Sequence, residues 1–212
     1  MINIPFTQES RLELINLMIK KTNANKYLEI GCDRDKIFNN VICDYKIGVD
    51  PFRGGNRRMT SDEFFSQNTE LFDVIFVDGL HYYEQVLKDV DNSLKFLNPN
   101  GVIIIHDMLP RKEEESVVPI PTPLPKTWLG DVWKLAFNLS ARTEVTFQLV
   151  LIDEGCGVVF KQPQEPKKLN IENSWKFYKD NVFNLPLISY TDFIKKYGTS
   201  YIYNIVLGGR AQ

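Results

Sequence analysis

The segment FDVIFVDGLHYYEQVLKDVDNSLKFLNPNGVIIIHD, residues 72–107, decides the fold class of this 212-residue chain. Its apolar runs at 72–77 and 102–105 are short and nearly continuous, a pattern typical of parallel strands buried on both faces. Between them, residues 82–97 carry apolar side chains at helical spacing and end before the turn sequence NPNG at 98–101. Strand, helix and strand in this order predict the crossover unit of a parallel sheet.

The segments on the N-terminal side extend this pattern. KYLEI at 26–30 and YKIGV at 45–49 predict two further strands, and an amphipathic helix over 7–22 precedes them. The connection from the second strand to residue 72 is short for two full crossovers. We therefore expect a stunted third strand around 58–60, followed by a helix over 62–67.

The segments on the C-terminal side differ in character. Five prolines within 110–125 predict an extended loop, because proline lacks a backbone N–H and restricts the residue before it. A helix is expected over 130–139. The β-rich runs 143–152 and 157–161 then predict an antiparallel hairpin that closes one edge of the sheet.

Together these elements predict a single α/β domain over residues 1–162. Its sheet is expected to be Rossmann-like, doubly wound and mostly parallel, with the antiparallel hairpin at its C-terminal end. Residues 163–212 are rich in aromatic side chains, and we expect this extension to pack on the same domain.

The composition narrows the range of partners. A net charge of −2 and a pI near 5.8 lack the basic balance of proteins that bind nucleic-acid phosphates, so we expect no nucleic-acid partner. The chain shows neither an apolar run of bilayer-spanning length nor the apolar core of a signal peptide, so we expect a cytoplasmic protein without a membrane partner. Three cysteines at irregular spacing favour neither a zinc site nor disulfides.

Several candidate site residues, most of them polar, stand at the carboxyl ends of the predicted strands, where open α/β sheets bind their ligands. They are Glu29, Gly31, Cys32 and Asp33 at the first strand, Asp50 and Pro51 at the second, Asp78 and His81 at the fourth, and His106 and Asp107 at the fifth.

Each of these residues also has a plain structural interpretation. Asp50 alone reads as a loop acid and His106 as a core histidine. The 21-residue separation of Glu29 from Asp50 instead favours an acid that binds ribose hydroxyls. The only two histidines of the chain, His81 and His106, fall at the same sheet edge beside Asp107, which favours an active site with a proton acceptor.

Taken together, the motifs resemble those of class I S-adenosylmethionine-dependent methyltransferases, in the branch associated with glycan and secondary-metabolite biosynthesis. The stretches that carry the resemblance cover most of residues 26–160: KYLEIGCD, KIGVDP, MTSDEFF, the block from FDVIFVDGLH to HDMLP, WLGDVWK and DEGCGVV. The pairing of DGLHYYEQV with a following HD is the most specific of them.

The resemblance implies S-adenosyl-L-methionine as cofactor and a role for each matching residue. Glu29, Gly31, Cys32 and Asp33 would lie against the methionine portion, Asp50 with the adjoining Pro51 at the ribose, and Ser61 and Asp62 by the adenine. Asp78 would line the place where donor and acceptor meet. His81, His106 and Asp107 would be the catalytic group, with either histidine as general base.

The implied reaction is methyl transfer to an oxygen of a small sugar-like or secondary-metabolite acceptor. A nitrogen acceptor and a homodimer stay open. Residues 32–35 lack the further glycines usual in the family, so the alternative is a non-catalytic binding protein with a degenerate cofactor loop. The missing G-x-G-x-x-G spacing disfavours a nicotinamide-dependent oxidoreductase.

Two aspartates at strand ends could also hold Mg²⁺, which prefers oxygen ligands. Metal-dependent relatives place a further ligand after the aspartate of the fifth strand, where this chain has Met108. We therefore assign no metal ligand and rank Mg²⁺ below a metal-free site.

Overall fold

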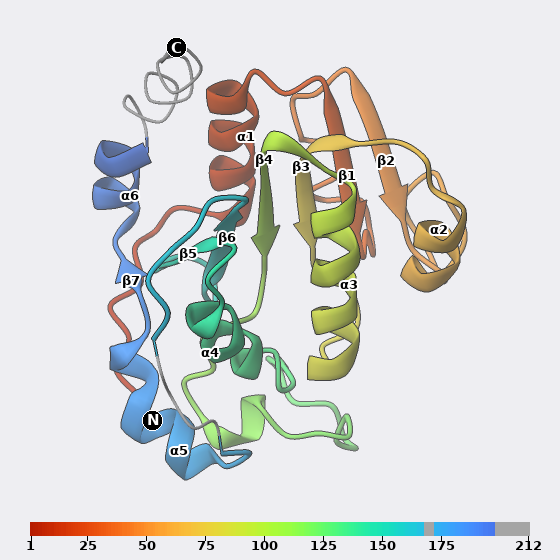
Figure 1. Ribbon diagram of the computed structural model, residues 1–212. Helices are drawn as coiled ribbons and strands as arrows, with labels where there is room; N and C mark the ends of the chain where they lie inside the picture. Colours follow the sequence, from red (N-terminus) through yellow and green to blue (C-terminus); the bar gives the residue numbers. More distant parts are fainter. Residues whose placement is uncertain (168–171, 198–212) are drawn as a thin grey trace.

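The computed structural model describes residues 1–167 and 172–197, and a seven-stranded mixed sheet organises them (Figure 1). The strand order is β2-β1-β3-β4-β6-β5-β7, with β1, β2, β3 and β4 parallel and β6 antiparallel to both β4 and β5. The bounds are β1 Lys26–Ile30, β2 Tyr45–Val49, β3 Phe72–Val77, β4 Leu97–Ile105, β5 Thr146–Val150, β6 Cys156–Phe160 and β7 Leu187–Ile188. The predicted α/β fold with an antiparallel hairpin is confirmed.

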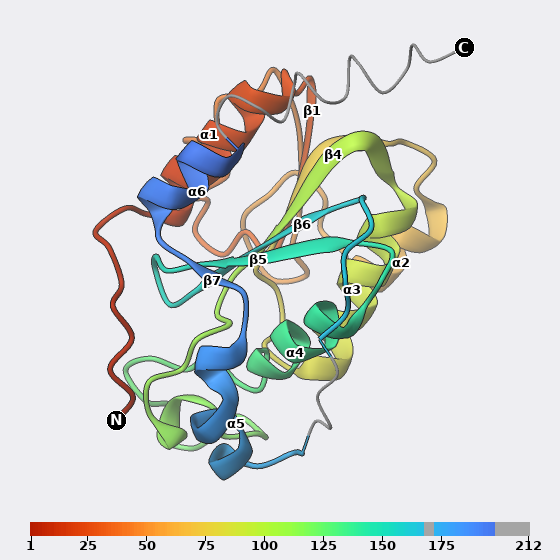
Figure 2. The ribbon, with the colours of Figure 1, turned by 60° about the vertical axis from the view of Figure 1, so that its left-hand side comes forward.

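Helices cover both faces of this sheet (Figure 2). Their bounds are α1 Arg11–Thr22, α2 Ser61–Gln67, α3 Tyr83–Lys95, α4 Trp133–Ala141, α5 Trp175–Asn181 and α6 Tyr190–Tyr197, with short 3-10 turns at Glu113–Glu115 and Val182–Asn184. One core cluster joins α1 and α6 to one face of the sheet, and another joins α2, α3 and α4 to the opposite face.

The strands feed the two core clusters alternately. Val74 packs under α1 and its neighbour Ile75 packs on the opposite face, and both are fully buried. Successive strand residues point to opposite faces, so a strand covered on both sides must be apolar throughout. This explains why the runs in the sequence are nearly continuous.

Helix α1 begins at a defined point. The Ser10 side chain accepts the backbone N–H of Glu13, and the Glu13 carboxylate accepts that of Ser10, which forms a capping box. The backbone N–H of Arg11 donates to Asp153 Oδ2 at 3.2 Å. The cap therefore fixes Arg11 at the carboxyl edge of the sheet.

Several elements differ in detail from the sequence-based expectation. The stunted third strand is reduced to a single parallel bridge between Val49 and Arg57. Strand β4 begins at Leu97, ahead of the expected turn, and its pairing with β3 is irregular between Phe72 and Val74. Helix α4 begins at Trp133, because 130–132 form turns.

The described part of the C-terminal segment contacts the rest of the chain at several points. The buried Tyr178 hydroxyl donates to the Pro110 carbonyl at 2.9 Å, and Phe193 joins the core beneath α6. Strand β7 pairs with β5. Residues 168–171 and 198–212 of the predicted extension lie outside the described residues. Among the described helices, none has the length and apolarity needed to cross a bilayer.

Candidate active site

A cavity of about 870 Å³ opens at the carboxyl ends of the parallel strands. All twelve residues predicted to bind cofactor or act in catalysis line it: Glu29, Gly31, Cys32, Asp33, Asp50, Pro51, Ser61, Asp62, Asp78, His81, His106 and Asp107. Because parallel strands end at one edge, segments far apart in the sequence meet here.

The loop after β1 keeps a left-handed backbone without additional glycines. Gly31 has φ +86°, and a Cβ on it would lie 2.1 Å from the Asp78 carbonyl oxygen, so no side chain fits there. Asp33 and Asp35 also have positive φ, at 47° and 60°. Aspartate tolerates this region better than most residues. The loop therefore follows a glycine-like path despite its composition.

Asp50 holds this loop in place. Its Oδ2 accepts the backbone N–H groups of Cys32 and Asp33 at 3.0 and 3.1 Å, and its Oδ1 accepts those of Phe52 and Arg53 at 2.8 and 2.9 Å. Burial alone would raise the pKa of Asp50, but these four bonds lower it. A carboxylate has about four lone-pair sites, so a ribose hydroxyl here would share an occupied group.

Glu29 lies beneath the loop as a buried acid. Its Oε2 accepts the Tyr27 hydroxyl at 2.6 Å, and its exposed fraction is 1%. Burial raises the pKa of Glu29 to about 8, although the Tyr27 hydrogen bond opposes the shift. This side of the cavity floor therefore changes charge near neutral pH.

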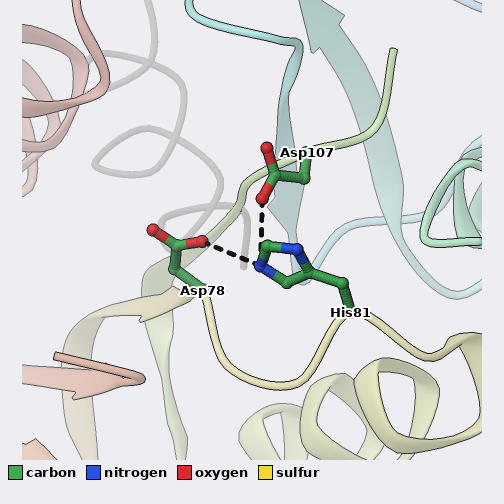
Figure 3. A group of neighbouring side chains, drawn as sticks. All are labelled: Asp78, His81 and Asp107. Carbon is green, nitrogen blue, oxygen red and sulfur yellow. Dashed lines mark ion pairs between the residues drawn. The ribbon is translucent and has the colours of Figure 1, made fainter. Parts of the chain in front are cut away.

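His81 stands between two carboxylates at the opposite side of the cavity (Figure 3). Its Nε2 lies 3.0 Å from Asp107 Oδ2 and 3.6 Å from Asp78 Oδ1. Its Nδ1 lies 3.1 Å from the Trp128 carbonyl, and the two rings stack at 5.4 Å. Burial would lower the pKa of His81, but the two aspartates outweigh it and raise the pKa to about 9.

His106 is more deeply buried, with 5% exposure and neighbours at both ring nitrogens. Nδ1 lies 3.0 Å from Asp107 Oδ1, while Nε2 lies 2.7 Å from both the Asp153 carbonyl and Arg11 Nη1. Nε2 cannot donate to the carbonyl and accept from Arg11 at once. Burial would lower the pKa of His106, but the carboxylates of Asp107 and Asp78 outweigh this effect and raise the pKa well above its usual value. The raised pKa favours a proton on both ring nitrogens, so Nε2 donates to the Asp153 carbonyl and leaves Arg11 to its ion pair with Asp153 at 3.1 Å.

The segment 127–131 fixes the position of His81. The backbone N–H of Asp131 donates to the His81 carbonyl at 3.3 Å, and a Cβ on Gly130 would lie 1.8 Å from that oxygen. Asp131 Oδ1 also accepts the N–H of Tyr83 at the start of α3, and its Oδ2 pairs with the buried Lys134 at 2.6 Å.

Several cavity residues escape prediction from the sequence. Arg11 and Glu154 reach the site from α1 and from the β5–β6 turn, and no spacing marks either of them. Asp89 interrupts the apolar stripe of α3 between Val86 and Val90, a signal that the sequence does contain. Glu115, within the acidic run Glu113–Glu115, is buried. It accepts the backbone N–H groups of two preceding residues, at 2.7 and 3.2 Å.

A family model described as a methyltransferase domain matches residues 47–108. Among curated proteins, no sequence matches the chain.

Several solved structures share its fold. A Staphylococcus aureus protein, provisionally named a caffeoyl-CoA O-methyltransferase, is 17% identical over 74% of this chain and 86% of its own, with a TM-score of 0.54. A Bacillus cereus O-methyltransferase in complex with SAH is 15% identical over 75% and 85%, with a TM-score of 0.52. The O-methyltransferase TomG of Streptomyces achromogenes, in complex with SAM, is 14% identical over 72% and 79%, with a TM-score of 0.51.

At these identities the structural neighbours establish the fold, and the family model covers the sequence from β2 to the residues just after β4. Residues 47–108 thus match a methyltransferase domain, and the chain shares the fold of solved O-methyltransferases.

Proposed function

We propose that this protein transfers the methyl group of S-adenosylmethionine to a hydroxyl oxygen of a small sugar-like or secondary-metabolite acceptor. One observation carries the proposal: His81 Nε2, held between Asp78 and Asp107, lines the same cavity as the glycine-like loop after β1. Methyl transfer needs a bound donor and a nearby group that takes the acceptor proton.

His81 serves as the general base in this proposal. The Trp128 carbonyl takes the proton on Nδ1, so Nε2 is the nitrogen that accepts the proton of the acceptor hydroxyl. Asp107 Oδ2, 3.0 Å from Nε2, then pairs with the imidazolium that this proton transfer forms. His106 is more deeply buried than His81, with side-chain exposed fractions of 5% and 21%, so His106 acts as a positioning residue that holds Asp107.

The residues on the opposite side of the cavity from His81 suit an S-adenosyl cofactor. Gly31, Cys32 and Asp33 would lie against its methionine portion, with Asp50 and Pro51 near the ribose and Ser61 and Asp62 near the adenine. When bound, the cofactor supplies an electrophilic methyl group on a sulfonium. In the transfer the acceptor oxygen gains the carbon and the sulfur keeps the bonding electron pair.

A bound metal is the second candidate for the region between the aspartates. Each of Asp78, His81 and Asp107 offers one possible ligand atom, and these three atoms all lie within 4.8 Å of one another. Mg²⁺ prefers oxygen ligands only, and the imidazole suits a transition metal better. The ring already bridges the two carboxylates, so we propose that transfer needs no Mg²⁺.

The test combines binding with an acceptor screen. Isothermal titration with S-adenosylmethionine establishes cofactor binding. Release of S-adenosylhomocysteine is then followed with sugars, phenols and amines, each with EDTA or added Mg²⁺. We expect turnover with a hydroxylated acceptor that EDTA leaves unchanged. Turnover with amines alone would contradict oxygen transfer, and absence of cofactor binding in a folded sample would support a non-catalytic binding protein.

A further inference from the structure

Asp89 is a carboxylate on the buried face of α3. Its exposed fraction is 1%, and it forms no ion pair within the described part of the chain. The adjacent Lys88 pairs with Asp62 at 2.5 Å instead. Burial raises the pKa of Asp89 to about 6, against hydrogen bonds from Ser61 and Gln85. A buried charge of this kind costs free energy unless a partner satisfies it.

The surroundings of Asp89 hold more acceptors than donors. Gln85 Nε2 faces three oxygens: Asp89 Oδ1 at 3.1 Å, Ser61 Oγ at 3.2 Å and Asp62 Oδ1 at 3.4 Å. An amide nitrogen carries only two hydrogens, and the Ser61 hydroxyl adds one more. Asp89 Oδ2 has no hydrogen-bond partner among the described residues.

This acceptor-rich corner belongs to the cavity. Asp89, Gln85, Ser61 and Asp62 all line it. Gly79, at the end of β3, forms the adjoining wall, and a Cβ built on it would lie 3.8 Å from Asp89 Oδ2. The free oxygen therefore lies next to a backbone position without a side chain, where a flat ring can approach closely.

We propose that Asp89 Oδ2 accepts a hydrogen bond from the exocyclic amino group of the cofactor's adenine and selects adenine against a 6-oxo purine. The inference rests on the proposed function. An amino group brings two N–H donors to a corner in which acceptors outnumber donors. A carbonyl at the same ring position would place its oxygen against the carboxylate, so that two acceptors face each other.

The test measures binding and needs no turnover. The full chain is titrated by calorimetry at pH 8, where the carboxylate is ionised, with S-adenosylhomocysteine and with its inosine analogue S-inosylhomocysteine. We expect the wild type to bind the adenine compound roughly tenfold more tightly or better, because a mismatched buried hydrogen bond is discriminated strongly. Asp89→Asn should lose most of this ratio, since its amide can donate to the 6-oxo group as well as accept.

Asp91→Asn is the matched control. Asp91 lies on the same helix, is half-exposed and pairs with Arg142 at 2.7 Å outside the cavity, so the variant should keep the wild-type ratio. Thermal unfolding checks that both variants fold, and Asp89→Asn should be at least as stable as wild type. An unchanged ratio in a folded Asp89→Asn overturns the assignment of Asp89 and leaves the proposed function intact. A folded wild type that binds neither compound overturns both.

Discussion

The two sides of the cavity are built in different ways. The cofactor wall, residues 29–33 with Asp50, is held mainly by backbone N–H groups that converge on a single carboxylate. The acceptor wall, made of Asp78, His81, His106 and Asp107, is held by side-chain contacts between charged groups and by the distant Arg11 and Asp153. Backbone hydrogen bonds therefore define the conformation of the cofactor wall. The protonation states of the acceptor wall depend instead on the charges of neighbouring side chains.

This contrast predicts that damage to the acceptor wall removes turnover and spares cofactor binding. His81→Ala should lower kcat by roughly 10²–10⁴-fold, the range for loss of a general base. The measurement is release of S-adenosylhomocysteine at saturating cofactor. Lys176→Ala, an exposed substitution on α5, is the control and should keep the wild-type rate. An unchanged rate in His81→Ala would remove this histidine from the mechanism.

Damage to the cofactor wall should instead act on stability and cofactor affinity. Gly31→Ala places a Cβ 2.1 Å from the Asp78 carbonyl oxygen at φ +86°, so we expect a loss of about 2–4 kcal/mol of unfolding free energy. Denaturant unfolding measures it. Gly79→Ala, whose Cβ has its nearest neighbour at 3.4 Å, is the milder comparison. Equal effects in the two variants would contradict the close approach seen at Gly31.

The acceptor wall should also determine the pH dependence of the rate. His81 must be neutral to accept a proton, and its neighbours raise its pKa to about 9. The rate should therefore increase with pH and level off above about 9. Steady-state kcat between pH 6 and 10 provides the check. A plateau that is already complete near pH 7 would mean that another group takes the proton.

The last expected effect concerns how the stability of the cofactor wall depends on pH. Burial raises the pKa of Glu29 from 4.5 to about 8, so the folded state keeps a proton that the unfolded chain releases. The stabilisation that Glu29 contributes to the folded state is fully present below pH 4.5 and decreases as the pH rises to about 8. Glu29→Gln should flatten this part of the curve of unfolding temperature against pH. Parallel curves for variant and wild type would rule out the shift.

Prediction from the sequence succeeded for the strands, because they depend on short contiguous signals, and the residues expected to bind the cofactor line one cavity. The apolar runs 26–30, 45–49 and 72–77 coincide with β1, β2 and β3. The unusual loop after Gly31 raised doubt, since positive φ at Asp33 cannot be read from composition. Only the fold shows that an aspartate takes the place of a glycine there.

Prediction was less complete for the acceptor wall. The two histidines and their aspartates were found because each ends a strand. Arg11 was not predicted, because it contacts His106 from a position 95 residues away in the sequence. The Trp128 carbonyl, which lies against Nδ1 of His81, was not predicted either. Such contacts arise from packing between segments that no local pattern connects.

The separation of cofactor binding from catalysis is tested most directly by a pair of calorimetric titrations with S-adenosylhomocysteine, one on the wild type and one on His81→Ala. The account predicts saturable binding to both, with Kd values within about threefold, since energetically independent sites add to within about 0.5 kcal/mol. Loss of binding in the folded variant, or its absence in the wild type, would contradict the separation of a cofactor wall from an acceptor wall.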